Sequence, residues 1–203
     1  LGADGKRYVF PNESTYFSWY SDFSSVVTVP QSELESYPLG ANVTMRPGTK
    51  LVKITTDPKV YAVLPDGVLT WLPDEATALA LYGEGWASRV VDVADAFFTN
   101  YTISATNVSA DAYPAGSLVK FGGDDVYYID ADGMARLIAD DAAFSANRFQ
   151  FGNVVDSTLT MPTAGETVTG NEDGLSDTSQ GAGGMIGTGS GLTVGLSSMT
   201  PGS

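Results

Sequence analysis

The sequence predicts a mainly β fold with short helices, built as three tandem β-hairpin or meander repeats and an extended glycine-rich C-terminal tail. Short apolar runs that end at Gly and Pro turn signals indicate strands. A turn glycine recurs at Gly5, Gly67 and Gly133, and an interval of roughly 60–70 residues indicates an array of small supersecondary units. From about residue 163, Gly, Ser, Thr and acidic residues dominate, as in a flexible linker.

These signals divide the chain into four parts. Residues 1–40 hold a partial first repeat, and residues 41–112 hold the second repeat. Residues 113–162 hold a shorter third repeat. Residues 163–203 form the Gly/Ser/Thr-rich tail, which ends in a predicted strand.

The second repeat shows the pattern most fully. Apolar runs at 51–54, 60–63 and 68–72 predict three strands, with a turn at Pro65-Asp66-Gly67 between the last two. Pro73 ends the third run. Asp74 is a suitable N-cap for a short helix over 76–82, and Gly83 is a suitable stop. Residues 42–45 are expected to form a lead-in strand.

The other two copies follow the same order. Residues 116–121 match 48–54, and residues 126–129 match 60–63. Asn12-Glu13 and Asp140-Asp141 stand where Asp74-Glu75 stands, each before a stretch with helical character. Valine-rich runs at 26–29, 90–93 and 154–155 follow about 20 residues after each glycine, and 158–161 is a further strand-like run.

The first copy lacks the two strands that precede the turn in the other copies. We therefore expect the strand formed by Lys6, Tyr8 and Phe10 to have an open edge, and open edges pair with other chains. In the tail, Leu192, Val194 and Leu196 alternate with small or polar residues. We predict that this segment adds as a strand to a neighbouring subunit, which gives an open polymer when the contact is head-to-tail.

Composition excludes several classes of function. The chain of 203 residues has 24 acidic and 10 basic side chains and a net charge of −14. This charge argues against nucleic-acid binding and against anionic lipid surfaces, and no apolar stretch is long enough to insert into a membrane. Cys and His are absent. Disulfides, Cys or His nucleophile pairs and the usual zinc sites are thereby excluded.

A metal site would have to use oxygen ligands, and the better of two candidates is weak; the other, Asp130-Ala131-Asp132-Gly133, is explained by the repeat turn. Asn171, Asp173 and Asp177 surround Gly174 in a segment that resembles the calcium loops of thrombospondin type 3 repeats. Thr169 stands where the first Asp of that pattern belongs, and Gln180 stands at the usual bidentate acid. No cofactor is expected to be required, and calcium is the one possible ion.

Four Asn-x-Ser/Thr sequons, at Asn12, Asn42, Asn100 and Asn107, are candidate glycosylation sites of an exported protein. The aromatic stretch 15–20 offers Tyr16, Trp19 and Tyr20 for stacking on sugar rings, although such a patch is also typical of a small core. Two carboxylates suffice for glycoside hydrolysis. Nothing singles out a pair among the acids, so no enzyme is predicted.

The repeat resembles one found in large secreted and surface-layer-like proteins of candidate-phyla and other bacteria. The resemblance rests on Gly-(Thr/Ser)-x-Leu-Val-Lys, Val-Tyr-x-Val, Gly-(Lys/Val)-x-x-Trp-x-Pro and Tyr-Pro-Leu-Gly, and it covers about residues 5–156. The third copy departs from it in its short helix and in lacking the Pro. The resemblance implies an extracellular or cell-surface setting and brings no catalytic residues.

Two function classes remain. In the first, the chain is a structural subunit of a filament or surface layer, whose partners are copies of itself joined by strand complementation. In the second, it is a module that binds cell-wall glycans.

Overall fold

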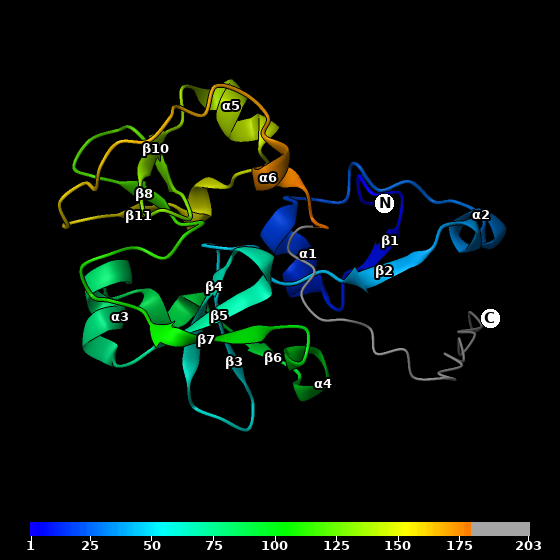
Figure 1. The fold of residues 1–203 in the computed structure, drawn as a ribbon, viewed down its shortest axis with the longest axis horizontal. Helices are drawn as coiled ribbons and strands as arrows, with labels where there is room; N and C mark the ends of the chain where they lie inside the picture. The colour runs from blue at the N-terminus through cyan, green and yellow to red at the C-terminus, as the bar shows by residue number, and fades with distance from the viewer. Residues whose placement is uncertain (180–203) are drawn as a thin grey trace, which may run out of the picture.

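The computed structural model describes residues 1–179, and the fold over that range is mixed α/β. It contains eleven strands and six short α-helices. The chain forms three lobes (Figure 1). We call residues 1–43 the N-terminal lobe, residues 44–112 the middle lobe and residues 113–179 the C-terminal lobe. The expectation of many short strands with short helices is therefore confirmed for the described residues.

The N-terminal lobe holds one small sheet. Strands β1 (Arg7–Val9) and β2 (Leu39–Asn42) pair in parallel and form a two-stranded sheet. Helices α1 (Glu13–Trp19) and α2 (Gln31–Ser36) lie between them in sequence. Helix α2 has no buried residue, and it lies at the far end of the lobe (Figure 1).

The middle lobe holds a five-stranded sheet with the order β6-β3-β4-β5-β7. Strands β3 (Leu51–Ile54), β4 (Val60–Leu64) and β5 (Val68–Leu72) form the antiparallel meander expected from the sequence. The chain crosses through α3 (Glu75–Tyr82) to β6 (Val90–Val93), which pairs in parallel with β3. Helix α4 (Asp95–Phe98) leads to β7 (Thr102–Asn107), which pairs in parallel with β5.

The C-terminal lobe holds a four-stranded sheet with the order β10-β9-β8-β11. Strands β8 (Leu118–Lys120), β9 (Tyr127–Ile129) and β10 (Ala135–Leu137) form an antiparallel meander. Helix α5 (Asp141–Ala146) leads to β11 (Val155–Asp156), which pairs in parallel with β8. Helix α6 (Asp173–Ser176) is a single turn that ends the described part.

Short polar side chains start the three helices that follow β1, β5 and β10. The side chains of Asn12, Asp74 and Asp140 each accept a hydrogen bond of 2.8 Å from the backbone N–H three residues on. This geometry satisfies an N–H that has no partner inside the helix. Gly83, at φ +67°, ends α3 as expected.

The middle and C-terminal lobes share one core. Leu51, Leu72, Val119 and Ile129 belong to a single buried cluster although they come from two sheets. The two lobes also meet at two glycine turns, where the backbones of Gly48 and Gly116 approach closely. A Cβ on Gly48 would lie 2.1 Å from the carbonyl oxygen of Gly116, so this approach requires glycine. Burial of the apolar side chains in this shared cluster is the main contribution that holds the middle and C-terminal lobes together.

Three expectations about local structure are wrong. Thr158–Met161 forms no strand. Instead, Ala164 bridges in parallel to Ala135 of β10, and Val168, which is fully buried, bridges in parallel to Ile138 just after β10. The lead-in strand is Leu39–Asn42, because residues 43–46 turn inward as buried irregular backbone. Residues 163–176 also pack on the body, so the expectation of a flexible linker from about residue 163 does not hold for them.

Candidate functional site

Exposed apolar side chains concentrate on the N-terminal lobe, which we take as the candidate site. Eight of the eleven exposed large hydrophobic residues in the described chain lie within residues 1–42: Leu1, Val9, Phe23, Val26, Val27, Val29, Leu34 and Leu39. Exposed apolar side chains that concentrate in one part of a protein make that part a candidate interaction surface.

Strand β1 has one paired and one free edge. The Arg7 N–H donates to the Pro38 carbonyl over 2.9 Å, and the Val9 carbonyl accepts from the Val43 N–H over 2.8 Å. Because the backbone groups of Arg7 and Val9 face β2, those of Tyr8 between them point to the opposite edge. Within residues 1–179 no strand pairs with that edge. The open edge expected from the sequence is therefore present among the described residues.

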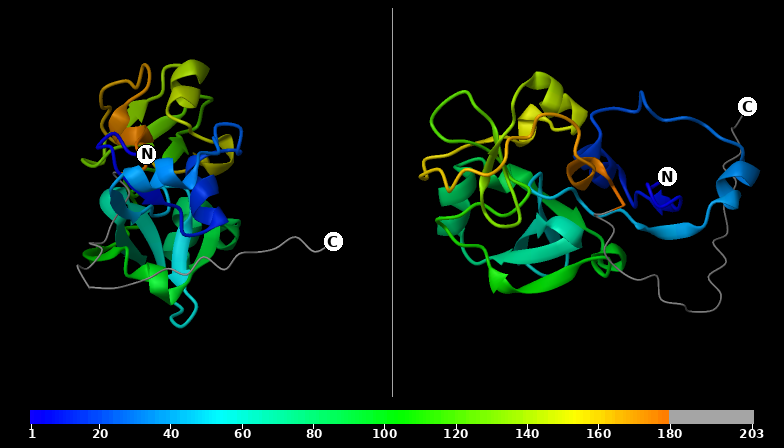
Figure 2. Two further views of the ribbon diagram at one scale, coloured as in Figure 1. Left: turned by 90° about the vertical axis from the view of Figure 1, so that its right-hand side faces the viewer. Right: turned by 45° about the horizontal axis from the view of Figure 1, so that its top comes forward.

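Residues 26–29 belong to no strand. Within the described range, none of residues 27–29 makes a backbone hydrogen bond. The side chain of Val27 is 79% exposed. Residues 20–30 form an arch from α1 to α2 that stands apart from β1 and β2 (Figure 2). The lobe thus offers two separate sets of free backbone groups, those of Tyr8 and those of residues 27–29.

The side chains on β1 are held in place by local contacts. The Tyr8 hydroxyl donates to Asp4 over 2.8 Å, and the Lys6 ammonium lies 3.1 Å from the same carboxylate. The hydrogen bond from the Lys6 backbone N–H, followed by the one from Tyr8, lowers the pKa of Asp4. The Tyr8 ring lies over Gly40, where a Cβ would be 2.8 Å from the ring. The three predicted assembly residues differ in exposure: Lys6 is exposed, whereas Tyr8 and Phe10 are half-buried.

The aromatic stretch forms a stacked cluster next to β1. Tyr16 stacks on Tyr20 with ring centroids 5.0 Å apart and on Phe23 at 4.7 Å, and Phe10 meets the Tyr16 ring edge-on. Trp19 does not join this surface, because it is only 4% exposed and its indole N–H donates to the Thr44 carbonyl. Trp19 is therefore a core residue and is not available to stack on sugars.

A buried arginine joins the three lobes, and no sequence pattern indicates this role. Arg46 is 4% exposed, and its guanidinium donates to the carbonyls of Arg148, Asn147 and Leu175 over 2.6–2.9 Å. Its guanidinium also lies 5.2 Å from the Trp19 ring. Burial lowers the pKa of Arg46 to about 10. A lone basic residue before a proline carries no pattern that predicts this role.

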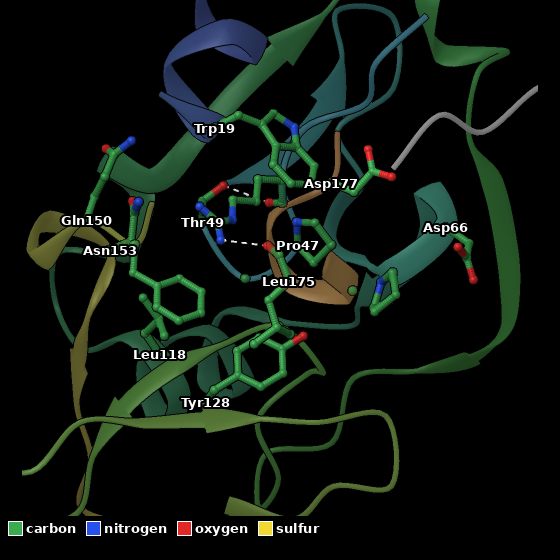
Figure 3. Close-up of a pocket in the computed structure, with 16 residues that line it drawn as sticks. Trp19, Pro47, Thr49, Asp66, Leu118, Tyr128, Gln150, Asn153, Leu175 and Asp177 are labelled. Carbon is green, nitrogen blue, oxygen red and sulfur yellow. Dashed lines mark hydrogen bonds between the residues drawn. The ribbon is translucent and has the colours of Figure 1, made fainter. Parts of the chain in front are cut away.

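The cavity beside Arg46 is lined by all three lobes, with Trp19, Leu118 and Tyr128 around it (Figure 3). Its volume is about 50 Å³. Ligand pockets for drug-sized molecules measure about 300–1,000 Å³, whereas one water occupies about 30 Å³ in the liquid. The cavity is therefore sized for a few waters rather than for a substrate.

The candidate calcium residues lie in and beside α6. Asn171 donates to the Asp173 carboxylate and accepts from the Ser176 hydroxyl, and the Asp177 carboxylate accepts two hydrogen bonds from Ser179. Among the described residues, no group of three or more acidic side chains is placed to hold a metal ion. Calcium binding by Asn171, Asp173 and Asp177 stays a prediction.

The four sequon asparagines have different surroundings. Asn12 and Asn107 are exposed, although the Asn12 side-chain oxygen caps α1. Asn42 and Asn100 are half-buried and face each other, with a side-chain contact of 3.4 Å. Two glycans on this pair would compete for one space. The predicted donor residues Leu192, Val194 and Leu196, like Gln180, lie outside the described residues.

Comparison of the chain with known protein families, curated proteins and solved structures finds no match. In residues 1–179 no helix has the length and apolar character that a membrane span requires.

Proposed function

We propose that this chain is a structural subunit of an extracellular assembly, a filament or surface layer, whose subunits join by strand complementation at the free edge of β1. The observation that carries the proposal is that edge, on a strand and in a lobe that carry exposed apolar side chains such as Val9. An exposed edge with an apolar surround is the usual acceptor for β-augmentation.

The proposal includes three copies of one structural unit in the chain. In each lobe the strand that precedes the capped helix pairs in parallel with a later segment: β1 with β2, β5 with β7, and β10 with residues 164–168. A buried valine closes each pairing, because Val43, Val108 and Val168 donate to the carbonyls of Val9, Trp71 and Leu137 over 2.8–2.9 Å. Tandem units of this kind suit an extended, load-bearing protein.

A pair of variants at Tyr8 tests the proposal. The Tyr8 N–H faces the free edge, so Tyr8→Pro removes the donor that an incoming strand needs while leaving the β1–β2 hydrogen bonds in place. Tyr8→Ala is the matched control, because it loses the ring but keeps the N–H. We expect the full chain and Tyr8→Ala to form polymers visible by negative-stain microscopy and sedimentation, and Tyr8→Pro to stay monomeric.

Two results would overturn the proposal. One is a full chain that stays monomeric at every concentration tested, and the other is a Tyr8→Pro variant that polymerises like Tyr8→Ala. A truncation after Ser179 tests the donor separately. If the segment 192–196 is the donor strand, the truncated chain keeps its fold and loses assembly.

Glycan binding is the second candidate function, and the stacked cluster of Tyr16, Tyr20 and Phe23 favours it. Phe23 is 56% exposed and lies on the Tyr16 ring. A flat aromatic face of this kind can stack on a pyranose ring. Binding of the full chain to cell-wall polysaccharide should then fall at least tenfold in Phe23→Ala, whereas Phe151→Ala, which removes an exposed ring of another lobe, should leave it unchanged.

A further inference from the structure

A cavity of about 390 Å³ lies between the N-terminal and C-terminal lobes. One wall is the first part of the arch, from Tyr20 to Ser25, and the other is the end of α5 together with Arg148 and Gln150 just beyond it. Pockets that hold small organic molecules measure about 300–1,000 Å³. This cavity therefore has room for a small ligand, unlike the space beside Arg46.

Arg148 has an unusual backbone conformation on this wall. Its φ is +54°, in the left-handed region that favours glycine. The Arg148 N–H donates to the Ser145 carbonyl over 2.8 Å, and the Phe149 N–H donates to the Phe144 carbonyl over 3.1 Å. These two bonds form the helix-ending motif in which glycine usually occupies the position of Arg148. Glycine would provide the same turn with less strain, so what Arg148 adds is its side chain.

The Arg148 guanidinium is only partly bonded within the protein. It lies 4.7 Å from the centroid of the Tyr20 ring, and Nη1 donates to the Tyr20 hydroxyl over 3.1 Å. Among residues 1–179, the buried Nε has no hydrogen-bond partner, and Nη2 donates no hydrogen bond. The N–H groups of Nε and Nη2 are parallel, so together they match the two oxygens of a carboxylate.

No carboxylate neutralises the charge of Arg148 in the described part of the chain. The three ion pairs there are Lys6–Asp4, Lys53–Asp92 and Arg136–Glu172. Arg46 lies close enough to be affected, because the charge of Arg148 is, after burial, the next cause that lowers the pKa of Arg46. Two neighbouring guanidinium groups without an acidic partner are a place where a bound anion is stabilised.

The remainder of the wall offers hydrogen-bonding groups. The hydroxyls of Ser25 and Ser145 line the cavity and have no hydrogen-bond partner within residues 1–179. The Gln150 amide is oriented by its N–H, which donates to the Phe17 carbonyl over 3.0 Å. Hydroxyl and amide groups can both donate to and accept from the hydroxyls of a ligand. The wall therefore suits a ligand that carries several hydroxyls.

Asp22 is the one acidic residue that lines the cavity. Its two carboxylate oxygens accept hydrogen bonds from the arch itself, one from the Ser24 N–H over 2.8 Å and one from the Ser21 hydroxyl over 3.2 Å. Its charge repels an anion, so the anionic group of a ligand must lie at the Arg148 end of the cavity.

We propose that this cavity binds a small hydroxylated carboxylic acid, of the class of a uronic acid unit, with its carboxylate on Nε and Nη2 of Arg148. The ligand hydroxyls lie against Ser25 and Ser145. The proposal goes beyond the proposed function, because it gives the subunit a ligand site away from the free edge of β1. It does not depend on assembly.

Calorimetric titration of the full chain with sodium glucuronate, at constant ionic strength, tests the role of Arg148. Arg148→Gly should weaken binding about tenfold or more, because it removes a bidentate, charged pair of donors. Glycine adopts the required backbone conformation, so this loss would not reflect unfolding. Lys53→Met is the control that removes one positive charge elsewhere, and it should bind like the unmodified chain. Equal affinity in Arg148→Gly and the unmodified chain would overturn the proposal.

Three other probes test the chemical class of the ligand. Glucose has the hydroxyls without the carboxylate, and acetate has the carboxylate without the hydroxyls. Both should bind about tenfold or more weakly than glucuronate, because each makes only part of the contacts. Inorganic phosphate should also bind more weakly, since the free donors of Arg148 form one planar pair. If acetate, glucose or phosphate binds as tightly as glucuronate, the assignment to a hydroxylated carboxylic acid is wrong.

NMR of the arginine side chains distinguishes a ligand contact from a purely structural role. Glucuronate should shift the Nε–H signal of Arg148, which is identified by its absence in Arg148→Gly. The Nε–H signal of Arg136, which donates to the Glu166 carbonyl, should stay in place. An Arg148 that only holds Tyr20 gives no shift, and that result would contradict the proposal.

Asp22→Asn tests where the carboxylate of the ligand lies. Asparagine keeps an oxygen for the Ser24 N–H and removes the negative charge from the cavity wall. Affinity for glucuronate should therefore rise about twofold or more, whereas affinity for glucose should stay the same. An unchanged or lower affinity for glucuronate would show that the anion binds outside this cavity.

Discussion

Replacing Arg46 by methionine should destabilise the whole molecule, because its guanidinium is the donor that ties the lobes together. Arg46→Met keeps a long unbranched side chain but leaves the carbonyls of Asn147, Arg148 and Leu175 without their donor. Hydrogen bonds from a charged group contribute about 1.5–3 kcal/mol each.

Arg46→Met also removes an unfavourable contribution to stability, the free-energy cost of burying a charge, because methionine is uncharged. Burial lowers the pKa of Arg46 well below its ordinary value, to about 10, which corresponds to roughly 3 kcal/mol of cost for the charged form. The difference between the two terms leaves a net loss of about 4 kcal/mol. For a chain of this size, this loss lowers Tm by about 10 °C.

Urea unfolding and calorimetry of the full chain measure the effect of Arg46→Met. Lys53→Met is the control, since the Lys53–Asp92 ion pair of 2.7 Å is solvent-exposed and should contribute under about 0.5 kcal/mol. A loss below about 1 kcal/mol for Arg46→Met would refute the reasoning. It would mean that water in the adjoining cavity replaces the guanidinium at the three carbonyls.

Three further variants test local features. Asn12→Ala removes the cap of α1 and should cost about 1 kcal/mol in urea unfolding, whereas Asn12→Asp should cost little; equal losses would contradict the capping role. Gly116→Ala should cost about 3 kcal/mol or more, because φ is +95° and the new Cβ would lie 2.5 Å from Pro47 Cβ; an unchanged urea midpoint would be inconsistent with that contact. Burial raises the pKa of Tyr82 well above its ordinary value, so the folded state keeps a proton that the unfolded state loses near pH 10. Stability should therefore fall above about pH 10, and the fall between pH 9 and 11 should be shallower in Tyr82→Phe; equal slopes would exclude Tyr82 as a cause.

The local signals in the sequence predict the elements of the fold well. Asp74 before a short apolar run predicts the capped helix α3, because capping is decided by residues three apart. The turn at Gly67 predicts the β4–β5 hairpin, because turn type is likewise decided by a few consecutive residues. Parallel pairing is different, since it joins segments far apart in sequence. No local pattern indicates that 102–107 pairs with β5, or that Val168 bridges to Ile138.

In the candidate site, too, some features are predictable from local sequence and others are not. The free edge of β1 is predictable, because residues 1–5 contain no strand-like run that could pair with it. The burial of Trp19 is not predictable, since an aromatic stretch has the same composition whether it faces solvent or core. Arg46 is invisible in the sequence because its three acceptors are backbone carbonyls more than 100 residues away, and a carbonyl acceptor leaves no mark on residue type.

The parallel pairing of each sheet with the segment that leads onward has a mechanical consequence. In the middle lobe β3, β5 and β7 all run in the same direction. The chain therefore enters the sheet at one end of its strands and leaves at the other, and the same holds for β1 and β2. A force that pulls the two termini apart acts along the strands and loads the hydrogen bonds of each ladder together, in shear. Stretching should therefore meet resistance that rises to one high rupture force per lobe, rather than the gradual unzipping of a hairpin pulled from its open end.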